Sequence, residues 1–224
     1  MRVATWNVRH GRPQRGFASN RRLAHGVAAL GAAVVAAQEV DLRVIRSWFA
    51  DQPRLLAGAA EATCFEFAPA RRLAVTGRDG IVLCVRGSAS FRHLSLPHAW
   101  GQPRVALIAD ARVDEVAVTI VATHLQNEAN EARRQLDWLL EEIAPLSRPC
   151  VLLGDLNLRP DDVADLFTNA GFELAGGPPT EPAWSPTQRI DHIAVAGLTI
   201  DAVTIGDAPV SDHLPLVATL TPPA

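Results

Sequence analysis

Eight polar residues stand at or just beyond the ends of apolar segments, where the strands of a sheet would end. They are Asn7, Glu39, His124, Asp155, Asn157, Asp191, Asp212 and His213. A buried carboxylate costs free energy unless it is paired or binds a metal ion. Several carboxylates that converge on one point repel each other, and a divalent cation relieves that repulsion. The set therefore predicts a metal-dependent site at one edge of the sheets.

The donor types in this set indicate which metal it would hold. Carboxylate and amide oxygens favour Mg²⁺ or Mn²⁺ over zinc. A site with few protein ligands and several waters suits Mg²⁺ in particular. Cys64, Cys84 and Cys150 have no CxxC spacing, which argues against a cysteine zinc site. We expect Mg²⁺ as the cofactor and expect Mn²⁺ to substitute for it.

The segments that must position these residues are mostly short and apolar, as in β-strands. Strands are predicted over Arg2–Val8, Ala33–Gln38, Ile81–Val85, Val105–Arg112, Val116–Thr123, Val151–Leu153, Ile190–Val195, Ile200–Ile205 and Leu216–Leu220. Short strands are also expected between Leu55 and Leu96, with a turn at 77–80.

Amphipathic segments between the strands predict helices. We expect them from Ser19 or Asn20 to Leu30, from Asp41 to about Phe49, over Glu131–Ile143, and from Asp161 or Asp162 to Gly171. No composition shift or charged linker divides the chain. The prediction is one α/β or α+β domain of stacked sheets with helices on the outer faces.

The bulk composition limits the partners of this domain. The 224 residues carry a net charge of −3, and all 21 basic residues are arginine. That balance is not typical of a protein that grips a long nucleic-acid backbone, although a bound metal can supply local positive charge. Without lysine, a Schiff base with a carbonyl substrate is excluded.

The ends and hydropathy of the chain bear on its location. The first residues, MRVATWNV, resemble a strand rather than a signal peptide. No apolar run approaches the length of a membrane span, about 20 residues. We expect a cytoplasmic monomer without a transmembrane segment.

Six segments resemble the motifs of the endonuclease/exonuclease/phosphatase superfamily, in the same order and spacing. They are TWNVRHG, AAQEV, ATHLQ, LLGDLNLRP, RIDHIAV and VSDHLPLVATL. The superfamily includes pancreatic-type deoxyribonucleases, abasic-site endonucleases, neutral sphingomyelinases and inositol polyphosphate 5-phosphatases. The resemblance implies one deoxyribonuclease I-like domain over residues 1–221, a four-layer sandwich of two mixed β-sheets flanked by helices.

The resemblance also implies a metal site. Glu39 would be the main metal ligand, with Asn7 beside it, and Asp212 would reach the metal through water. Arg9 departs from the abasic-site endonuclease branch, where an acid at this position helps to hold the metal. Arg9 is therefore expected, with His10, to face substrate anions instead.

The catalytic roles implied by the resemblance fall on the remaining residues. Asp155 would orient or deprotonate the attacking water, and Asn157 would contact the phosphate or the nucleophile. His213 would sit on the phosphate with Asp191 as its carboxylate partner, and His124 resembles the second active-site histidine of the deoxyribonuclease and sphingomyelinase branches. Another candidate contact to the substrate is Arg104.

Elementary chemistry supports these roles independently. A phosphate ester is negative and resists attack by anions, so a metal ion and cationic donors are needed to neutralise the charge of the transition state. The attacking water needs a base within about 3 Å. A histidine held by a carboxylate has its tautomer fixed and its cationic form favoured.

We therefore predict an enzyme, a Mg²⁺-dependent phosphoesterase that hydrolyses a phosphodiester or a phosphomonoester by in-line attack of water. The phosphate-ester substrate stays open among small molecules, lipid head groups and nucleic acids. An endonuclease or exonuclease of the same family is the first alternative. A non-catalytic, partner-binding member of the fold is the second.

Overall fold

The structure, a computed structural model, describes residues 1–73 and 76–222, which form two β-sheets of six strands each. In order across the first sheet lie β11 (Thr199–Ile205), β12 (Leu216–Thr221), β1 (Arg2–Asn7), β2 (Val34–Leu42), β4 (Gly77–Val85) and β3 (Cys64–Leu73). In order across the second lie β5 (Ser88–Ser95), β6 (Val105–Val113), β7 (Val116–His124), β8 (Cys150–Asp155), β10 (Asp191–Ala196) and β9 (Glu173–Leu174). Both sheets are mixed, because β1 pairs with β2 and β7 with β8 in parallel.

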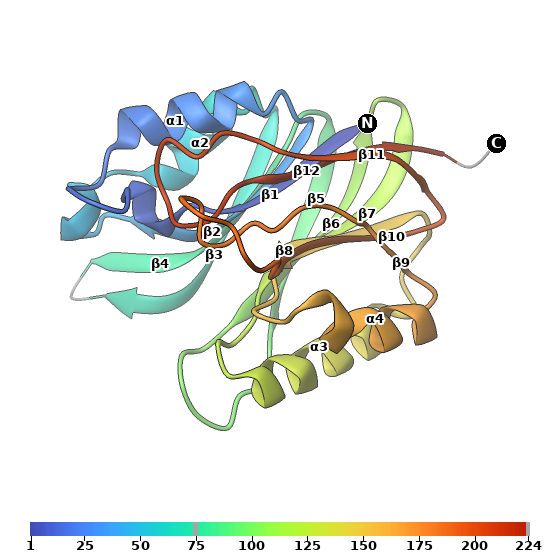
Figure 1. Cartoon of the computed structure of the whole chain (residues 1–224). Coiled ribbons are helices and arrows are strands. Elements are labelled where there is room, and N and C mark those ends of the chain that lie inside the picture. Colours follow the sequence, from blue (N-terminus) through green and yellow to red (C-terminus); the bar gives the residue numbers. More distant parts are fainter. Residues whose placement is uncertain (74–75, 223–224) are drawn as a thin grey trace.

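Helices cover the outer face of each sheet (Figure 1). They are α1 (Asn20–Ala29), α2 (Gln52–Ala59), α3 (Ala129–Ile143) and α4 (Pro160–Asn169), with short 3₁₀ turns η1 (Arg9–Gly11) and η2 (Ile45–Ser47). The pair α1 and α2 packs on the first sheet, and α3 and α4 pack on the second. This arrangement confirms the predicted four-layer sandwich.

The two sheets pack face to face around the main hydrophobic core. Leu83 and Val34 of the first sheet and Ile120 and Leu153 of the second belong to this core and are fully buried. The outer faces of the central strands are buried as well, under the helices. Burial on both faces explains why these strands are continuous apolar runs rather than alternating ones.

The longest helix shows how sequence determines an element here. Leu136, Leu139 and Ile143 recur at helical spacing and are buried against the second sheet. The Glu128 carboxylate accepts hydrogen bonds from the backbone N–H groups of Asn130 and Glu131 and caps the helix start. The helix predicted over Glu131–Ile143 is therefore confirmed, with two more residues at its start.

The helix predicted to start at Asp41 was wrong. The strand β2 continues to Leu42, and Asp41 is fully buried in it. Its carboxylate accepts two hydrogen bonds from Arg46, at 2.9 and 2.7 Å, so it is not available as a helix cap. The true cap is Asp51, whose carboxylate accepts from the N–H of Arg54 at the start of α2.

The turn predicted at residues 77–80 was also wrong, because these residues belong to β4. Gly77 and Gly80 are needed for close approach of the neighbouring strand rather than for a change of direction. A Cβ atom at Gly80 would lie 2.1 Å from the carbonyl oxygen of Ala68, and one at Gly77 would lie 2.4 Å from that of Leu73. The pairing of β3 with β4 is irregular between Pro69 and Arg71.

One more glycine of this kind adjoins the predicted site. A Cβ atom at Gly154 in β8 would lie 2.1 Å from the carbonyl oxygen of Thr123 in β7. We expect Gly154→Ala to lower the free energy of unfolding by about 1–3 kcal/mol, because two paired strands must move apart. Urea unfolding measures the effect. Gly58→Ala in α2 is the control, since a Cβ there meets nothing within 4 Å; equal urea midpoints for Gly154→Ala and wild type would contradict the prediction.

Candidate active site

The polar residues predicted from the sequence converge at one edge of the sandwich, where strands of both sheets end. Asn7 ends β1, His124 ends β7 and Asp155 ends β8. Asp191 begins the antiparallel strand β10, directly opposite Asp155. His213 lies in the segment that enters β12 from the same edge.

Asn7 links the two sheets within this cluster. Its side-chain Nδ2 donates to Asp155 Oδ2 at 2.9 Å and to Glu39 Oε1 at 3.1 Å, and its Oδ1 accepts from the N–H of Arg9. The amide thus fixes a carboxylate of the first sheet and a carboxylate of the second at a common point. Its observed role is to orient both acids, while direct contact of Asn7 with a metal stays a prediction.

Glu39 reaches the site because β2 is irregular there. The pairing of β2 with β4 shifts register between Ala37 and Val40, and Glu39 has a left-handed backbone with φ 54°. Such an irregularity turns a side chain away from its regular direction in the sheet. The Glu39 side chain is 31% exposed, so its carboxylate is open to solvent as a metal ligand must be.

A buried network of charged residues holds Glu39 from behind. His10 is buried, and its Nε2 lies 3.1 Å from Glu39 Oε2. Arg46 Nη2 lies 3.0 Å from His10 Nδ1 and donates to Asp41 Oδ1 at 2.7 Å and to Asp79 Oδ2 at 2.5 Å. Burial lowers the pKa of His10, and the charge of Glu39 opposes that shift. His10 therefore contacts Glu39 in this structure, and its contact with substrate anions stays a prediction.

Asp155 is buried at the centre of the cluster. Its Oδ1 accepts from the N–H of Asn157 at 3.1 Å, and its Oδ2 lies 3.4 Å from His124 Nε2 and 3.9 Å from His213 Nε2. Burial raises the pKa of Asp155 to about 7, while the charge of His213 opposes the shift and that of Asp191 adds to it. Its position and basicity suit a group that accepts a proton from water near neutral pH.

His213 and Asp191 form a buried ion pair. His213 Nδ1 donates to Asp191 Oδ2 at 2.9 Å, and the Thr180 hydroxyl donates to the same oxygen at 2.6 Å. Burial alone would lower the pKa of His213, but the charges of Asp191 and Asp155 outweigh it and raise the pKa to about 10. The imidazole is therefore a cation at neutral pH, with Nε2–H directed towards Asp155.

This ion pair predicts the alkaline limb of the pH profile. If cationic His213 is the active form, kcat/KM falls as pH rises through its pKa of about 10. In Asp191→Asn the carboxylate charge is lost while burial remains, so we expect this fall to move to lower pH. Rates measured across the pH range test the shift, with Asp201→Asn on the exposed strand β11 as the control. An unchanged alkaline limb in Asp191→Asn would contradict the assignment.

His124 differs from His213 because its partner is a cation. Arg104 Nη1 donates to His124 Nδ1 at 2.9 Å, which leaves the ring proton on Nε2, facing Asp155. Burial and then the charge of Arg104 lower the pKa of His124 well below its usual value. The site thus holds a neutral histidine and a cationic histidine on the same carboxylate.

The remaining predicted residues lie at the rim of the cluster. Asn157 has a left-handed backbone with φ 53°, and its Nδ2 donates to the carbonyl oxygen of Leu125, which leaves its second N–H for another acceptor. Arg9 Nη1 pairs with Asp212 Oδ2 at 3.2 Å. The predicted anion-binding Arg9 and the predicted metal-facing Asp212 thus neutralise each other in this structure.

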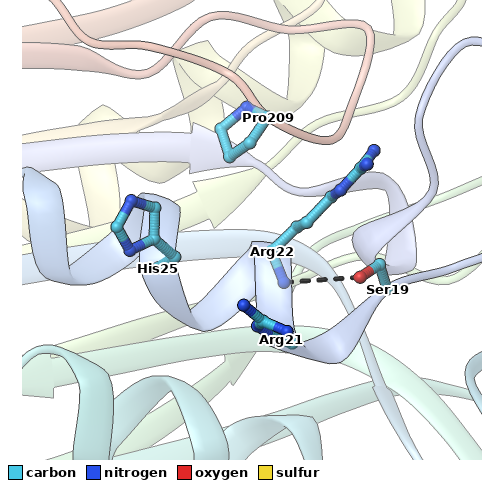
Figure 2. A pocket seen from close by; sticks show the side chains of 5 residues that line it. All are labelled: Ser19, Arg21, Arg22, His25 and Pro209. Carbon is cyan, nitrogen blue, oxygen red and sulfur yellow. Dashed lines mark hydrogen bonds between the residues drawn. The ribbon is translucent and has the colours of Figure 1, made fainter.

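Two hollows open beside Glu39. One of about 410 Å³ is lined by Glu39, Arg71, Asp79, Gly101, Gln102, Arg104, His124, Gln126 and Asn127. Arg104 is buried, and its Nε has no hydrogen-bond partner among the described residues. The smaller hollow, of about 150 Å³, is lined by Arg9, His10, Arg12, Ala18, Glu39 and Arg46. A larger one, of about 670 Å³, lies away from the carboxylates, beside the start of α1 (Figure 2).

The residues fit a hard divalent cation. The open acid Glu39 offers only oxygen donors, and the buried carboxylates of Asp155 and Asp191 lie nearby. The second group of acids, Asp41 and Asp79 with His10, already surrounds the guanidinium of Arg46. The chemistry of Glu39 and its open position therefore fit a divalent cation there, with Asn7 beside it.

Three residues that the sequence did not predict support the predicted ones. Asp79 and Arg46 belong to the charged network around Glu39, and Thr180 donates a hydrogen bond to Asp191.

No helix in residues 1–73 and 76–222 is long and apolar enough to cross a membrane.

Comparisons with known proteins identify the family and the fold. A sequence profile described as the Endonuclease/Exonuclease/phosphatase family matches residues 4–213. A search of proteins with curated descriptions gave no match.

Solved structures share the fold at low identity. An endonuclease/exonuclease/phosphatase from Beutenbergia cavernae DSM 12333 is 22% identical with a TM-score of 0.82, over 99% of this chain and 71% of the other. The human Nocturnin catalytic domain with bound sulfate is 17% identical with a TM-score of 0.74, over 100% and 94%. A mannosyl-6-phosphatase from Bacteroides thetaiotaomicron VPI-5482 is 14% identical with a TM-score of 0.69, over 99% of both chains. With a family match over nearly its whole length, the chain belongs to the endonuclease/exonuclease/phosphatase family.

Proposed function

We propose that this protein is a Mg²⁺-dependent phosphoesterase that hydrolyses a phosphodiester or phosphomonoester bond by in-line attack of water. One observation carries the proposal. The buried carboxylate of Asp155 lies between an amide that also binds the open acid Glu39 and a cationic histidine, His213. This arrangement supports the proposal because the three residues lie around one point, where Asp155 would accept a proton, Glu39 would bind the metal and His213 would bind an anion.

The proton acceptor would be Asp155. It is held by Asn7 and by the N–H of Asn157, so its orientation is fixed before a substrate binds. With its pKa raised to about 7 by burial, Asp155 accepts a proton more readily than an ordinary carboxylate does. The attacking water would lose its proton to Asp155 as the oxygen approaches phosphorus.

Charge on the phosphate would be met by three groups. When bound, Mg²⁺ held by Glu39 and Asn7, with Asp212 reaching it through water, supplies positive charge to the phosphate oxygens. His213 would donate its Nε2–H to a phosphate oxygen as negative charge builds there. The free N–H of Asn157 would add a neutral donor.

His124 and Arg104 would act on the substrate side of the site. His124 presents a neutral Nε2–H towards Asp155, because burial and the charge of Arg104 lower its pKa and the hydrogen bond from Arg104 fixes its tautomer. Arg104 lines the 410 Å³ hollow beside Glu39, where it can receive another anionic part of the substrate. Arg9 would join it only if its pair with Asp212 opens.

A substrate panel tests the proposed function. Purified protein is assayed with bis-p-nitrophenyl phosphate, with p-nitrophenyl phosphate and with supercoiled plasmid, each in Mg²⁺, in Mn²⁺ and in EDTA. The name of the mannosyl-6-phosphatase is the reason to include monoesters. We expect hydrolysis of at least one small ester in Mg²⁺ or Mn²⁺ and none in EDTA. Activity confined to plasmid would favour the nuclease alternative, and inactivity on the whole panel would favour a non-catalytic role.

A further inference from the structure

Large apolar side chains are exposed mainly around the active-site edge. Phe17 lies between β1 and α1, Ile45, Trp48 and Phe49 lie between β2 and α2, and Trp100 and Trp184 lie in loops that border the site. The carbonyl oxygen of Trp100 accepts from Gln126, which lines the same hollow as Glu39. The N–H of Ala183, next to Trp184, donates to the carbonyl oxygen of Asp212. Exposed apolar groups that gather in this way indicate a contact surface.

Four of these residues, Phe17, Ile45, Trp48 and Phe49, form what we call the aromatic patch. Their exposed fractions are 81, 73, 64 and 62%. The rings of Phe17 and Trp48 touch edge to face, with centroids 6.1 Å apart. The patch therefore joins two loops that are about 30 residues apart in the sequence.

The backbone fixes the patch in its exposed position. Trp48 and Phe49 both have left-handed backbones, with φ of 61° and 55°, a conformation that is unfavourable for bulky residues. The Trp48 indole N–H donates to the carbonyl oxygen of Ala18, and the Asn20 side chain donates to the carbonyl oxygen of Ser47. Despite the strain, most of each of these two side chains stays exposed within the chain, which points to a gain on contact with something else.

The surroundings of the patch are strongly basic. Residues 9–54 contain eight arginines and three acids, although the whole chain has a net charge of −3. Six of these arginines other than Arg46 are exposed, whereas Arg46 is paired with the buried Asp41 and with Asp79. Figure 2 shows Arg21, Arg22 and His25 along the start of α1, at the hollow opposite Pro209. An anionic partner matches this charge.

The patch also adjoins the active site. The 150 Å³ hollow is lined by Ala18 next to the patch and by Glu39 of the site, with Arg9, Arg12 and Arg46 around it. A surface that covers the patch would therefore face the opening beside Glu39. Trp100 and Trp184 border the same edge from the second sheet and from the loop before β10.

We propose that the active-site edge docks on an anionic phospholipid surface, with the aromatic patch in the head-group region and the arginines on the lipid phosphates. Aromatic rings with a basic rim are suited to a membrane interface, where apolar bodies are buried and cations meet anionic head groups. A second copy of the chain fits less well, because a two-fold contact would bring the same arginines together. Single-stranded nucleic acid fits less well, because Ile45 has no ring to stack on bases and the Phe17 and Trp48 rings pack on each other.

Vesicle sedimentation in EDTA tests docking without turnover, so its outcome is separate from that of the proposed function. We expect the full chain to sediment with vesicles of phosphatidylcholine and phosphatidylglycerol, and much less with phosphatidylcholine alone. Phe17→Ser with Trp48→Ser should weaken binding by roughly tenfold or more, because two rings that the membrane interface would bury are removed. Phe65→Ser, an exposed aromatic on the outer strand β3, should leave binding unchanged.

Charge reversal gives a second test that does not touch the rings. Arg15→Glu with Arg43→Glu should weaken binding to anionic vesicles, and added salt should weaken wild-type binding. The proposal is overturned if the wild-type protein does not sediment with anionic vesicles, or if the ring variants bind them as well as wild type. It is also overturned if wild type forms a concentration-dependent dimer in sedimentation velocity and the patch variants do not. A single-stranded oligonucleotide that binds wild type more tightly than vesicles do, and that the patch variants fail to bind, would overturn it as well.

Discussion

Replacing Glu39 with glutamine is expected to remove most of the metal-dependent activity. Glu39 is the open carboxylate of the cluster, and the amide of glutamine binds a divalent cation much more weakly than a carboxylate does. The side chain keeps its size, but Asn7 and His10 contact different oxygens of Glu39, so the single amide oxygen of glutamine can accept from only one of them. We expect a fall in kcat/KM of about 100-fold or more at limiting Mg²⁺, partly recovered at high Mg²⁺.

Magnesium titrations of the rate, with calorimetric titration of Mn²⁺ binding, measure this effect. Glu61→Gln is the matched control, because Glu61 is exposed and its carboxylate lies 3.8 Å from Arg86, far from the cluster. The control should keep the wild-type Mg²⁺ dependence. A Glu39→Gln protein with the wild-type rate and the same half-saturating Mg²⁺ concentration would show that the metal binds elsewhere.

Replacing His213 with alanine is expected to lower kcat by at least about 100-fold, with a smaller change in KM. The loss follows from the removal of the cation that faces the reacting phosphate, a contact that strengthens in the transition state. The fold should persist, since the bond from Trp6 Nε1 uses the backbone oxygen of His213. Asp191 would lose one of its two partners and keep the Thr180 hydroxyl.

Steady-state kinetics at saturating metal measure the effect, with circular dichroism to confirm folding. His93→Ala is the control, because His93 is an exposed histidine on β5 that pairs with Glu66 on β3, the edge strand of the other sheet. It should keep the wild-type rate. A fall of less than tenfold in His213→Ala would remove this residue from the mechanism.

Much of the site could be predicted because single polar residues interrupt apolar strands. Asp155 ends a buried apolar strand, and Glu39 lies within another, and hydrophobic packing does not explain a carboxylate at either position. Parallel strands then bring their carboxyl ends to the same edge, which explains why distant motifs meet. Hydrophobic periodicity likewise predicted the paired strands β6 and β7 and the long helix α3.

The rest depends on features that no local pattern carries. The contact of Asp79 with Arg46 requires the register shift between β2 and β4, and the sequence of β4 resembles a turn because of its glycines. Thr180 reaches Asp191 from a long loop whose path is set by tertiary contacts. Arg9 was expected to face substrate, yet it pairs with Asp212, which lies more than 200 residues further along the chain.

The hydrogen bond between Asn7 and Asp155 spans the interface of the two sheets, so catalytic activity should depend on the two sheets being packed together. Each half of the sandwich could retain its secondary structure in a loosened intermediate, yet the base would then lose its alignment with the metal ligand. Activity should therefore vanish in denaturant no later than the tertiary signal of the buried Trp6 and ahead of the helical signal. The loss of activity and the loss of tertiary packing would then share one midpoint, and the loss of helix would follow at higher denaturant.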